Sequence, residues 1–243
     1  MIYRHTNEDK GTSQQMNHWK VEFHAHTHYS KDSLTGLEAF LKRCQMRGID
    51  RVAVTDHNTI NGALAMAKLD PERVIVGEEI MTSQGELLAF FVKENVPPLL
   101  SPQETIRRLR DQGAFISVSH PFDRLRKGAW ELPDLEAIVA EVDAIEVFNA
   151  RCLFPQDNAK AVEFAVKHHK IFTVGSDAHL PSELAAATMT LPPFEDGITL
   201  RHALAEAQVH TRYNPFWVHL YSKYAKWMRK LGVAHLPGET VYA

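Results

Sequence analysis

Histidine and carboxylate side chains gather near the start of the chain, in the run VEFHAHTHYSKD at residues 21–32. His24, His26 and His28 occupy alternate positions, and Asp32 follows them. On a β-strand, alternate side chains share a face and lie about 6–7 Å apart. His24 and His26 could therefore chelate one metal ion or serve two neighbouring ions. Asp32 follows in a loop that could fold back over the strand end.

The same kinds of side chain recur where five later apolar runs end. These groups are Asp56 and His57, Glu78 and Glu79, His120, Glu146 and Asn149, and Asp177 and His179. Strand alternation sends only one of Glu78 and Glu79 to the strand end, where a carboxylate can bridge two metals. His57 is the better ligand of its pair, because Asp56 could orient a ligating histidine or cap the next helix. Asp177 and His179 would share a face if their strand continues.

A single buried histidine or aspartate most often only satisfies backbone groups, but six such coincidences favour a metal site. Imidazole and carboxylate ligands without thiolates suit Zn²⁺, Mn²⁺ or Fe²⁺. The groups are too many for one ion, so we expect two or three divalent ions. Two ions about 3.5–4 Å apart can clamp the attacking and leaving oxygens of a displacement at phosphorus and activate a bridging water.

The elements that carry these groups alternate in type. Apolar, often β-branched runs are WKVEFHA, RVAVTDH, RVIVGEEI, ELLAFFV, AFISVSH, AIEVFNA, IFTVGSDA and TMTL, and segments of helical period separate most of them. This alternation predicts βαβ units and a mainly parallel sheet. Six or more units in about 190 residues suit a closed or nearly closed barrel. The polar groups would then meet at the C-terminal ends of the strands.

The motifs HAHTHYSKD, TDH, GEE, SHP and SDAH, in this order, resemble the PHP (polymerase and histidinol phosphatase) superfamily. The resemblance covers about residues 21–190. It implies an α/β fold, a distorted (β/α)7 TIM-like barrel, with a site for up to three divalent metals at the C-terminal ends of the strands, and phosphoesterase chemistry. The implied ligands are His24, His26, Glu79 and Asp177 for one ion, Glu79 and His120 for a second, and Asp32, His57 and His179 for a third.

The stretch EVFNARCLF departs from the family pattern. Some members supply a further histidine there, and this chain has none, so Asn149 or water would complete the second metal's shell. Asp56 is expected to support the site or to be a ligand. Glu79 and His120 are too close in sequence to leave much room for the subdomain that some nucleotide-cleaving relatives insert.

Catalysis also needs a proton carrier and cations for the phosphate. Asp177, His179 and His26 are predicted to be catalytic, with one rim group moving the proton. Arginines that follow rim residues could grip a phosphate with two parallel hydrogen bonds. The candidates are Arg124, Arg126 and Arg151.

We expect a polar leader at residues 1–18, the barrel at 19–210 and a basic amphipathic helix and tail at 211–243. Apolar residues of the last segment recur three and four apart, which predicts a stripe on a helix. They are Trp217, Tyr221, Tyr224, Met228 and Leu231, and the basic residues among them are Lys223, Lys226, Arg229 and Lys230. A helix packed on the barrel, or closing it from below, is favoured over one that docks on a partner, RNA or a membrane, although an oligomer could form through it.

Composition narrows the class of protein. Apolar residues make up 44% of 243 residues, and the formal charge is −3, which gives no basic field for a stable nucleic-acid complex. Two separated cysteines argue against a disulfide framework or a thiolate zinc site. The polar start and the lack of an apolar run long enough for a membrane span predict a cytoplasmic protein.

Three functions fit these observations. The leading hypothesis is a metal-dependent phosphoesterase that hydrolyses a small phosphorylated metabolite, a nucleotide or a short oligonucleotide through metal-activated hydroxide. The second is an amidohydrolase-like metallohydrolase, which a rim lysine would favour and none supplies. The third is a non-catalytic metal-stabilised module, which the nearly complete ligand set disfavours.

Overall fold

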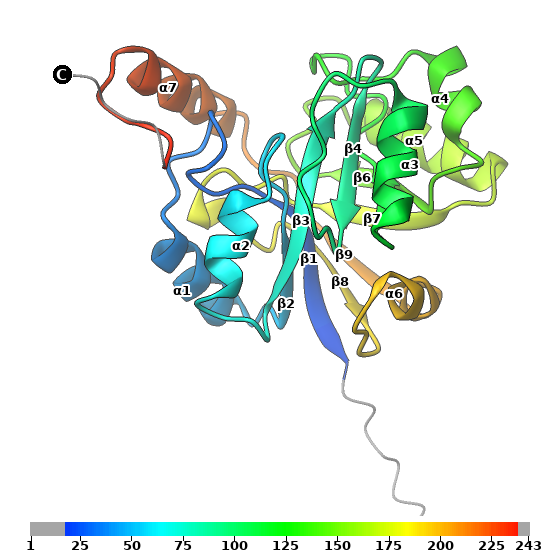
Figure 1. Cartoon of the computed structure of the whole chain (residues 1–243), viewed down its shortest axis with the longest axis horizontal. Helices are drawn as coiled ribbons and strands as arrows, with labels where there is room; N and C mark the ends of the chain where they lie inside the picture. Colours follow the sequence, from blue (N-terminus) through cyan, green and yellow to red (C-terminus); the bar gives the residue numbers. More distant parts are fainter. Residues whose placement is uncertain (1–17, 238–243) are drawn as a thin grey trace, which may run out of the picture.

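The structure, a computed structural model, describes residues 18–237, and its strands form one nine-stranded sheet (Figure 1). The strands are β1 (Trp19–Ala25), β2 (Arg51–Val54), β3 (Val74–Met81), β4 (Glu86–Phe90), β5 (Phe115–Val118), β6 (Ala144–Asn149), β7 (Ile171–Gly175), β8 (Ala187–Leu191) and β9 (Gln208–Thr211). The helices are α1 (Leu37–Arg47), α2 (Asn61–Ala67), α3 (Pro102–Asp111), α4 (Leu132–Ile138), α5 (Pro155–Lys167), α6 (Gly197–Leu204) and α7 (Val218–Lys230), with a short 3-10 turn at Pro181–Glu183.

The sheet curls into a nearly closed barrel, which confirms the predicted α/β barrel class. Strands β1 to β7 lie in sequence order around it, with α1 and α2 on one side and α3 to α5 on the other (Figure 1). The ring closes beyond the end of β7, where the backbone N–H of His26 donates to the carbonyl oxygen of Ala178 at 2.8 Å. The other half of the same edge of β1 pairs with β8 instead, so the barrel is distorted.

The expectation of a mainly parallel sheet is wrong in one important respect. β4 runs antiparallel to both of its neighbours, β3 and β5, while β8 and β9 add two further antiparallel pairings. The turn at residues 82–85 is too short for the crossover that a parallel pair requires, so β4 must run back along β3. The N-terminal end of β4 consequently lies at the rim where the other barrel strands end.

Alternation along β1 separates an apolar face from a polar face. Phe23 packs in the main core with Phe90, at 5.3 Å between ring centroids, whereas Glu22 and His24 lie in buried polar surroundings. Ser176 donates to the Glu22 carboxylate, and burial raises the pKa of Glu22 to about 7. The Glu22 carboxylate also accepts from the backbone N–H of His24 at 3.3 Å, which helps to fix the direction of the first histidine.

α7 lies against the rim and does not close the barrel from below. A terminal nitrogen of Arg229 donates to the carbonyl oxygens of His28 and Ser33 at 2.7 and 2.8 Å, in the loop after β1. Figure 1 shows α7 on the same side of the molecule as α1 and α2. The helix buries Val218 and Ala225 and leaves Trp217, Tyr224 and Leu231 of the predicted stripe exposed. Of the predicted leader, only His18 falls within the described residues. No described helix combines the length and the hydrophobicity that a membrane span requires.

Candidate metal centre

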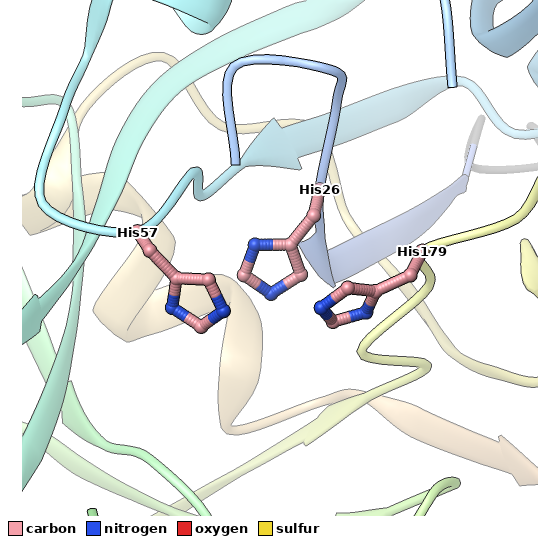
Figure 2. Close-up of side chains that lie close together, drawn as sticks. All are labelled: His26, His57 and His179. Atoms are coloured by element: carbon pink, nitrogen blue, oxygen red, sulfur yellow. The ribbon is translucent and has the colours of Figure 1, made fainter. Parts of the chain in front are cut away.

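The eight predicted ligands converge at the rim from six different parts of the chain. His26, His57 and His179 approach one another from the ends of three strands (Figure 2). The ring centroid of His26 lies 4.4 Å from that of His57 and 4.3 Å from that of His179. The Nε2 atoms of His24 and His26 are 3.1 Å apart, which confirms that these alternate side chains share a face.

Glu79 is the centre of this cluster. Its carboxylate oxygens lie 3.3 Å from Nε2 of His24, 2.9 Å from Nδ1 of His57 and 3.1 Å from Nε2 of His120. Its neighbour Glu78 points the other way and accepts from the backbone N–H of Val96 at 3.1 Å. Glu79 is therefore the member of the GEE pair that reaches the rim, in the position a bridging carboxylate needs.

The other carboxylates complete two further groups. Asp177 Oδ1 lies 3.2 Å from Nε2 of His26, and Asp32 Oδ1 lies 3.4 Å from Nε2 of His57 and 3.2 Å from Nε2 of His179. Asp32 thus folds back over the rim from its loop. The strand before Asp177 ends at Gly175, and Asp177 itself has a left-handed φ of 50°. A turn, and not strand alternation, therefore brings Asp177 and His179 together.

Buried atoms in this cluster are left without hydrogen bonds of good geometry. They are Oδ1 of Asp32, Oε2 of Glu79, Oδ1 of Asp177 and Nδ1 of His120. Three of the four are carboxylate oxygens with imidazole nitrogens 2.9–3.4 Å away, so the donors and acceptors point at shared space and not at each other. Buried polar atoms are normally paired. The residues present therefore fit divalent cations, which carboxylate oxygens and imidazole nitrogens bind.

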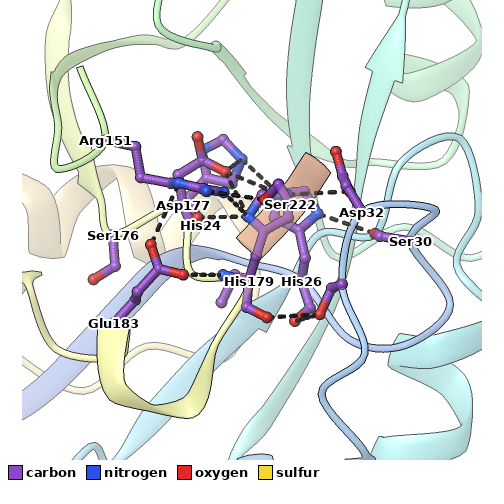
Figure 3. Close-up of polar contacts among 12 residues, drawn as sticks. His24, His26, Ser30, Asp32, Arg151, Ser176, Asp177, His179, Glu183 and Ser222 are labelled. Atoms are coloured by element: carbon purple, nitrogen blue, oxygen red, sulfur yellow. Dashed lines mark hydrogen bonds and ion pairs between the residues drawn. The ribbon is translucent and has the colours of Figure 1, made fainter. Parts of the chain in front are cut away.

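Each histidine has one ring nitrogen that faces away from the cluster, and the hydrogen bond of that nitrogen determines which atom faces the cluster. Asp56 accepts from the Ser30 hydroxyl at 2.7 Å, so the Ser30 oxygen must accept from Nδ1 of His26, 3.1 Å away (Figure 3). Likewise Glu146 lies 2.9 Å from Nδ1 of His24. Both imidazoles consequently direct Nε2 into the cluster, the nitrogen that a metal would bind. Asp56 acts here through Ser30 and caps no helix.

His179 is held in the same way by the backbone. Its Nδ1 lies 2.8 Å from the carbonyl oxygen of Asp177, and the guanidinium of Arg151 contacts the same nitrogen. Burial, with Arg151 next, lowers the pKa of His179 to about 4. The imidazole stays neutral and its Nε2 faces Asp32.

Metal binding requires neutral imidazoles and ionised carboxylates, and Asp177, His26 and His179 meet this requirement. Burial alone would raise the pKa of Asp177, but Arg126 and His24 hold it well below its usual range. Burial and His57 lower the pKa of His26 to about 4. For His24, burial opposes protonation but the surrounding carboxylates, Glu79 first, raise the pKa well above the usual value. The carboxylates therefore carry excess negative charge, which bound cations would balance.

Glu86 belongs to the site although the sequence did not single it out. It is buried at the first position of β4, with its carboxylate 3.5 Å from Nε2 of His120 and 4.0 Å from Nδ1 of His57. Together with His57 and Glu79 it forms a group that could hold an ion. In a parallel strand this residue would lie at the opposite end of the barrel, so the short turn before it was the signal that could have revealed it.

Asn149 supports the carboxylates instead of facing the centre. Its amide nitrogen donates to Glu146 at 3.1 Å and to Asp177 at 3.3 Å, and its oxygen accepts from the backbone N–H of Arg151 at 3.0 Å. Glu86, by contrast, has a carboxylate oxygen 3.5 Å from Nε2 of His120.

The three arginines suggested for phosphate binding lie in three different environments. Arg126 lines a cleft over the metal centre and contacts Asp177. Arg124 pairs with Asp157 and lies over the ring of Phe154, at 4.9 Å from its centroid. Arg151 is buried and does not line the cleft. Its contacts are Glu183 at 3.3 Å, the carbonyl oxygen of Val218 at 2.9 Å and Ser222 at 2.9 Å (Figure 3).

The cleft has a volume of about 1080 Å³ and opens over Asp32, His57 and Glu86. Its walls come from the loop after β1, the loop after β5 and α7. The centre can therefore be reached by a ligand, although most of its side chains are buried.

Glu78 provides a stability prediction, because burial raises its pKa to about 8. A carboxyl with a folded-state pKa above its unfolded value of 4.5 loses stability as pH rises through this interval. Glu78→Gln should therefore raise Tm by roughly 5 °C at pH 9 and by much less at pH 5, measured by calorimetry. An equal Tm change at both pH values would show that Glu78 is not protonated in the folded protein.

Two family profiles match the chain. The PHP domain matches residues 22–96, and the PHP-associated family matches residues 155–208. Two uncharacterized proteins of Methanocaldococcus jannaschii are similar in sequence. MJ1587 is 37% identical over 145 residues, which cover 54% of this chain and 82% of that protein, and MJ0417 is 36% identical over 171 residues, which cover 69% and 68%.

Solved structures with the same fold are more distant in sequence. PsfC from Pseudomonas syringae has a TM-score of 0.65 at 17% identity, covering 88% of this chain and all of that one. A protein described as a metal-dependent phosphoesterase from Bifidobacterium adolescentis has a TM-score of 0.54 at 16% identity, covering 77% and 95%. The lesion-specific endonuclease EndoQ from Pyrococcus furiosus has a TM-score of 0.55 at 14% identity, covering 79% and 58%.

The first matched range contains five predicted ligands and Glu86, and the second contains Asp177 and His179. Sequence, fold and the position of the polar cluster agree, and the chain belongs to the PHP domain family.

Proposed function

We propose that this protein is a metal-dependent phosphoesterase that uses two to three divalent ions, Zn²⁺, Mn²⁺ or Fe²⁺. The observation that carries the proposal is the set of unpaired buried oxygens of Asp32, Glu79 and Asp177 among converging imidazoles, at the floor of an open cleft. Bound ions there would neutralise a phosphate and lower the pKa of a coordinated water. The substrate is a small phosphorylated metabolite, a nucleotide or a short oligonucleotide.

The residues of the chain divide the remaining work. Arg126 is the cation best placed for the phosphate, because it lines the cleft beside Asp177. His26 and His179 present Nε2 to the centre and have their Nδ1 atoms engaged by other partners, which suits ligands. Asp177 has a second oxygen, Oδ2, directed toward Arg126 and Asn149. We assign proton acceptance from the attacking water to Asp177.

The amidohydrolase alternative has less support. A carbamate bridge between metals would need a lysine among the ligands, and the bridging position among His24, His57 and His120 is already taken by Glu79. The cationic walls of the cleft also favour an anionic substrate over a neutral amide.

The first test measures metal content of the purified protein together with hydrolysis of an aryl phosphate and a bis-aryl phosphodiester. We expect chelation to remove activity and Mn²⁺ or Zn²⁺ to restore it, because a bound metal ion is needed to turn water into the hydroxide that attacks phosphorus. His26→Ala should lose both metal and activity. A protein that binds metal but hydrolyses an amide and neither ester would contradict the proposal.

A further inference from the structure

Positive charge surrounds the metal centre along the cleft. The lining cations are Lys31, Arg126, Lys127, Lys223 and Lys226. The acidic residues of the same lining are Asp32 and Glu86, and both belong to the metal centre. Once divalent ions balance these two carboxylates, the cleft is cationic throughout. A monophosphate would contact one of these cations at most, and Arg126 is the one proposed to bind it.

The lysines of α7 form a row that starts at the centre. Lys223, Lys226 and Lys230 are three and four positions apart, so they lie on one side of the helix. The Nζ atom of Lys226 is 3.0 Å from Oδ2 of Asp32. Lys223, one turn earlier, lines the same cleft. Two members of the row thus line the cleft, and the middle one contacts a predicted metal ligand.

A second row on α7 is aromatic and exposed. Its members, at spacings of three and four, are Trp217, Leu220, Tyr224, Trp227 and Leu231, each about half exposed at 47%, 59%, 48%, 55% and 55%. The rings of Tyr224 and Trp227 lie 6.2 Å apart. By helical geometry this row flanks the lysine row, and the third face of the helix packs on the barrel through Val218 and Ala225. Its aromatic side chains therefore serve no core.

We propose that α7 binds single-stranded nucleic acid, with phosphates on the lysine row, bases on the aromatic row and one end of the strand at the metal centre. Alternating contacts of this kind, cations for the backbone and aromatic faces for bases, bind single strands without sequence preference. The inference rests on the proposed function and names its substrate class as short single-stranded oligonucleotides. Only a few lysines contribute, so binding is transient and salt-dependent.

A helix with basic and aromatic residues of this kind could instead lie on a membrane surface. In that geometry basic residues flank the apolar face toward the lipid headgroups. Here the lysines on one flank line the cleft, and the other flank is occupied by the barrel. The arrangement favours a ligand that enters the cleft.

The test measures fluorescence anisotropy of a labelled eight-nucleotide oligothymidylate with chelated protein over a series of salt concentrations. Three lysine contacts predict a slope of log K against log salt of about −2, and Lys223→Gln with Lys230→Gln should reduce it to about −0.7. Trp227→Ala should weaken binding roughly five-fold or more. Lys42→Gln, which removes an exposed lysine on α1, is the matched control and should change nothing. Lys226 is left intact because it touches a metal ligand.

With metal present, the double variant should raise KM for the oligonucleotide about ten-fold and leave kcat/KM for an aryl phosphate within about two-fold. Unchanged oligonucleotide binding in the double variant overturns the proposal. The proposal is also overturned if the double variant loses binding to phosphatidylserine vesicles while its binding to the oligonucleotide is unchanged, because α7 would then be a membrane helix. The anisotropy assay measures binding and involves no catalysis. Absence of esterase activity would therefore contradict the proposed function, and the anisotropy result would still test whether α7 binds the oligonucleotide.

Discussion

Glu79→Gln is expected to lower kcat for phosphoester hydrolysis by at least about three orders of magnitude. Each ion contributes several kcal/mol of charge stabilisation, and each 1.4 kcal/mol is a factor of ten in rate. The substitution keeps the volume and an oxygen that can accept from Ser119, at 2.7 Å. It places an amide nitrogen, which cannot ligate, among the histidines. Metal content measured by mass spectrometry should fall by at least one ion per chain.

Glu78→Gln is the matched control for this experiment. It makes the same chemical change one residue earlier, on the opposite face of β3, where the side chain bonds Val96. This variant should retain its metal and its activity at pH 7. If both variants were equally active, Glu79 would not bridge ions and the assignment of the centre would be wrong.

Arg229→Ala should lose the ion held by Asp32, His57 and His179 and retain the ions bound deeper in the barrel. Arg229 donates to the carbonyl oxygens of His28, Ser30 and Ser33, the loop that positions Asp32. Residues that orient ligands without touching the metal are typically worth 10–100-fold in affinity or activity. Activity should therefore fall by about that factor, while metal content falls by about one ion per chain.

Lys230→Ala controls for the loss of a positive charge from the same turn of α7. Lys230 is exposed and makes no described contact with the loop, so metal content and aryl phosphatase activity should stay unchanged. Restoring metal binding to Arg229→Ala by raising the metal concentration would support a positioning role. Loss of all ions together would show instead that α7 is needed for the whole barrel to fold.

The histidine motifs could be predicted from the sequence because a strand's two-residue period fixes which side chains share a face. His24 with His26, and Glu79 over Glu78, follow from this period alone. Whether a strand runs parallel or antiparallel to its neighbours cannot be read from this period. The pattern of ELLAFF is the same whether β4 runs parallel or antiparallel to its neighbours, so Glu86 could not be placed at the rim from periodicity.

The C-terminal helix shows a second limit. An apolar stripe predicts the buried face of a helix that packs on an apolar core. α7 packs on a polar rim, through Arg151 to its backbone and Arg229 to a loop, and it buries small apolar residues between these contacts. Hydrophobic periodicity therefore located the helix in the sequence and misjudged which side faces the barrel. The lysine contact with Asp32 likewise depends on tertiary geometry that spacing does not encode.

The bonds from Arg229 to residues 28–33 also order events during synthesis. The histidines of β1 leave the ribosome first and α7 leaves after the whole barrel, so the sheet can close while the Asp32 loop is still free. A nascent chain would hold the deeper ligands in place before the outer site is secured. Translation therefore separates the formation of the fold from the acquisition of the complete metal centre.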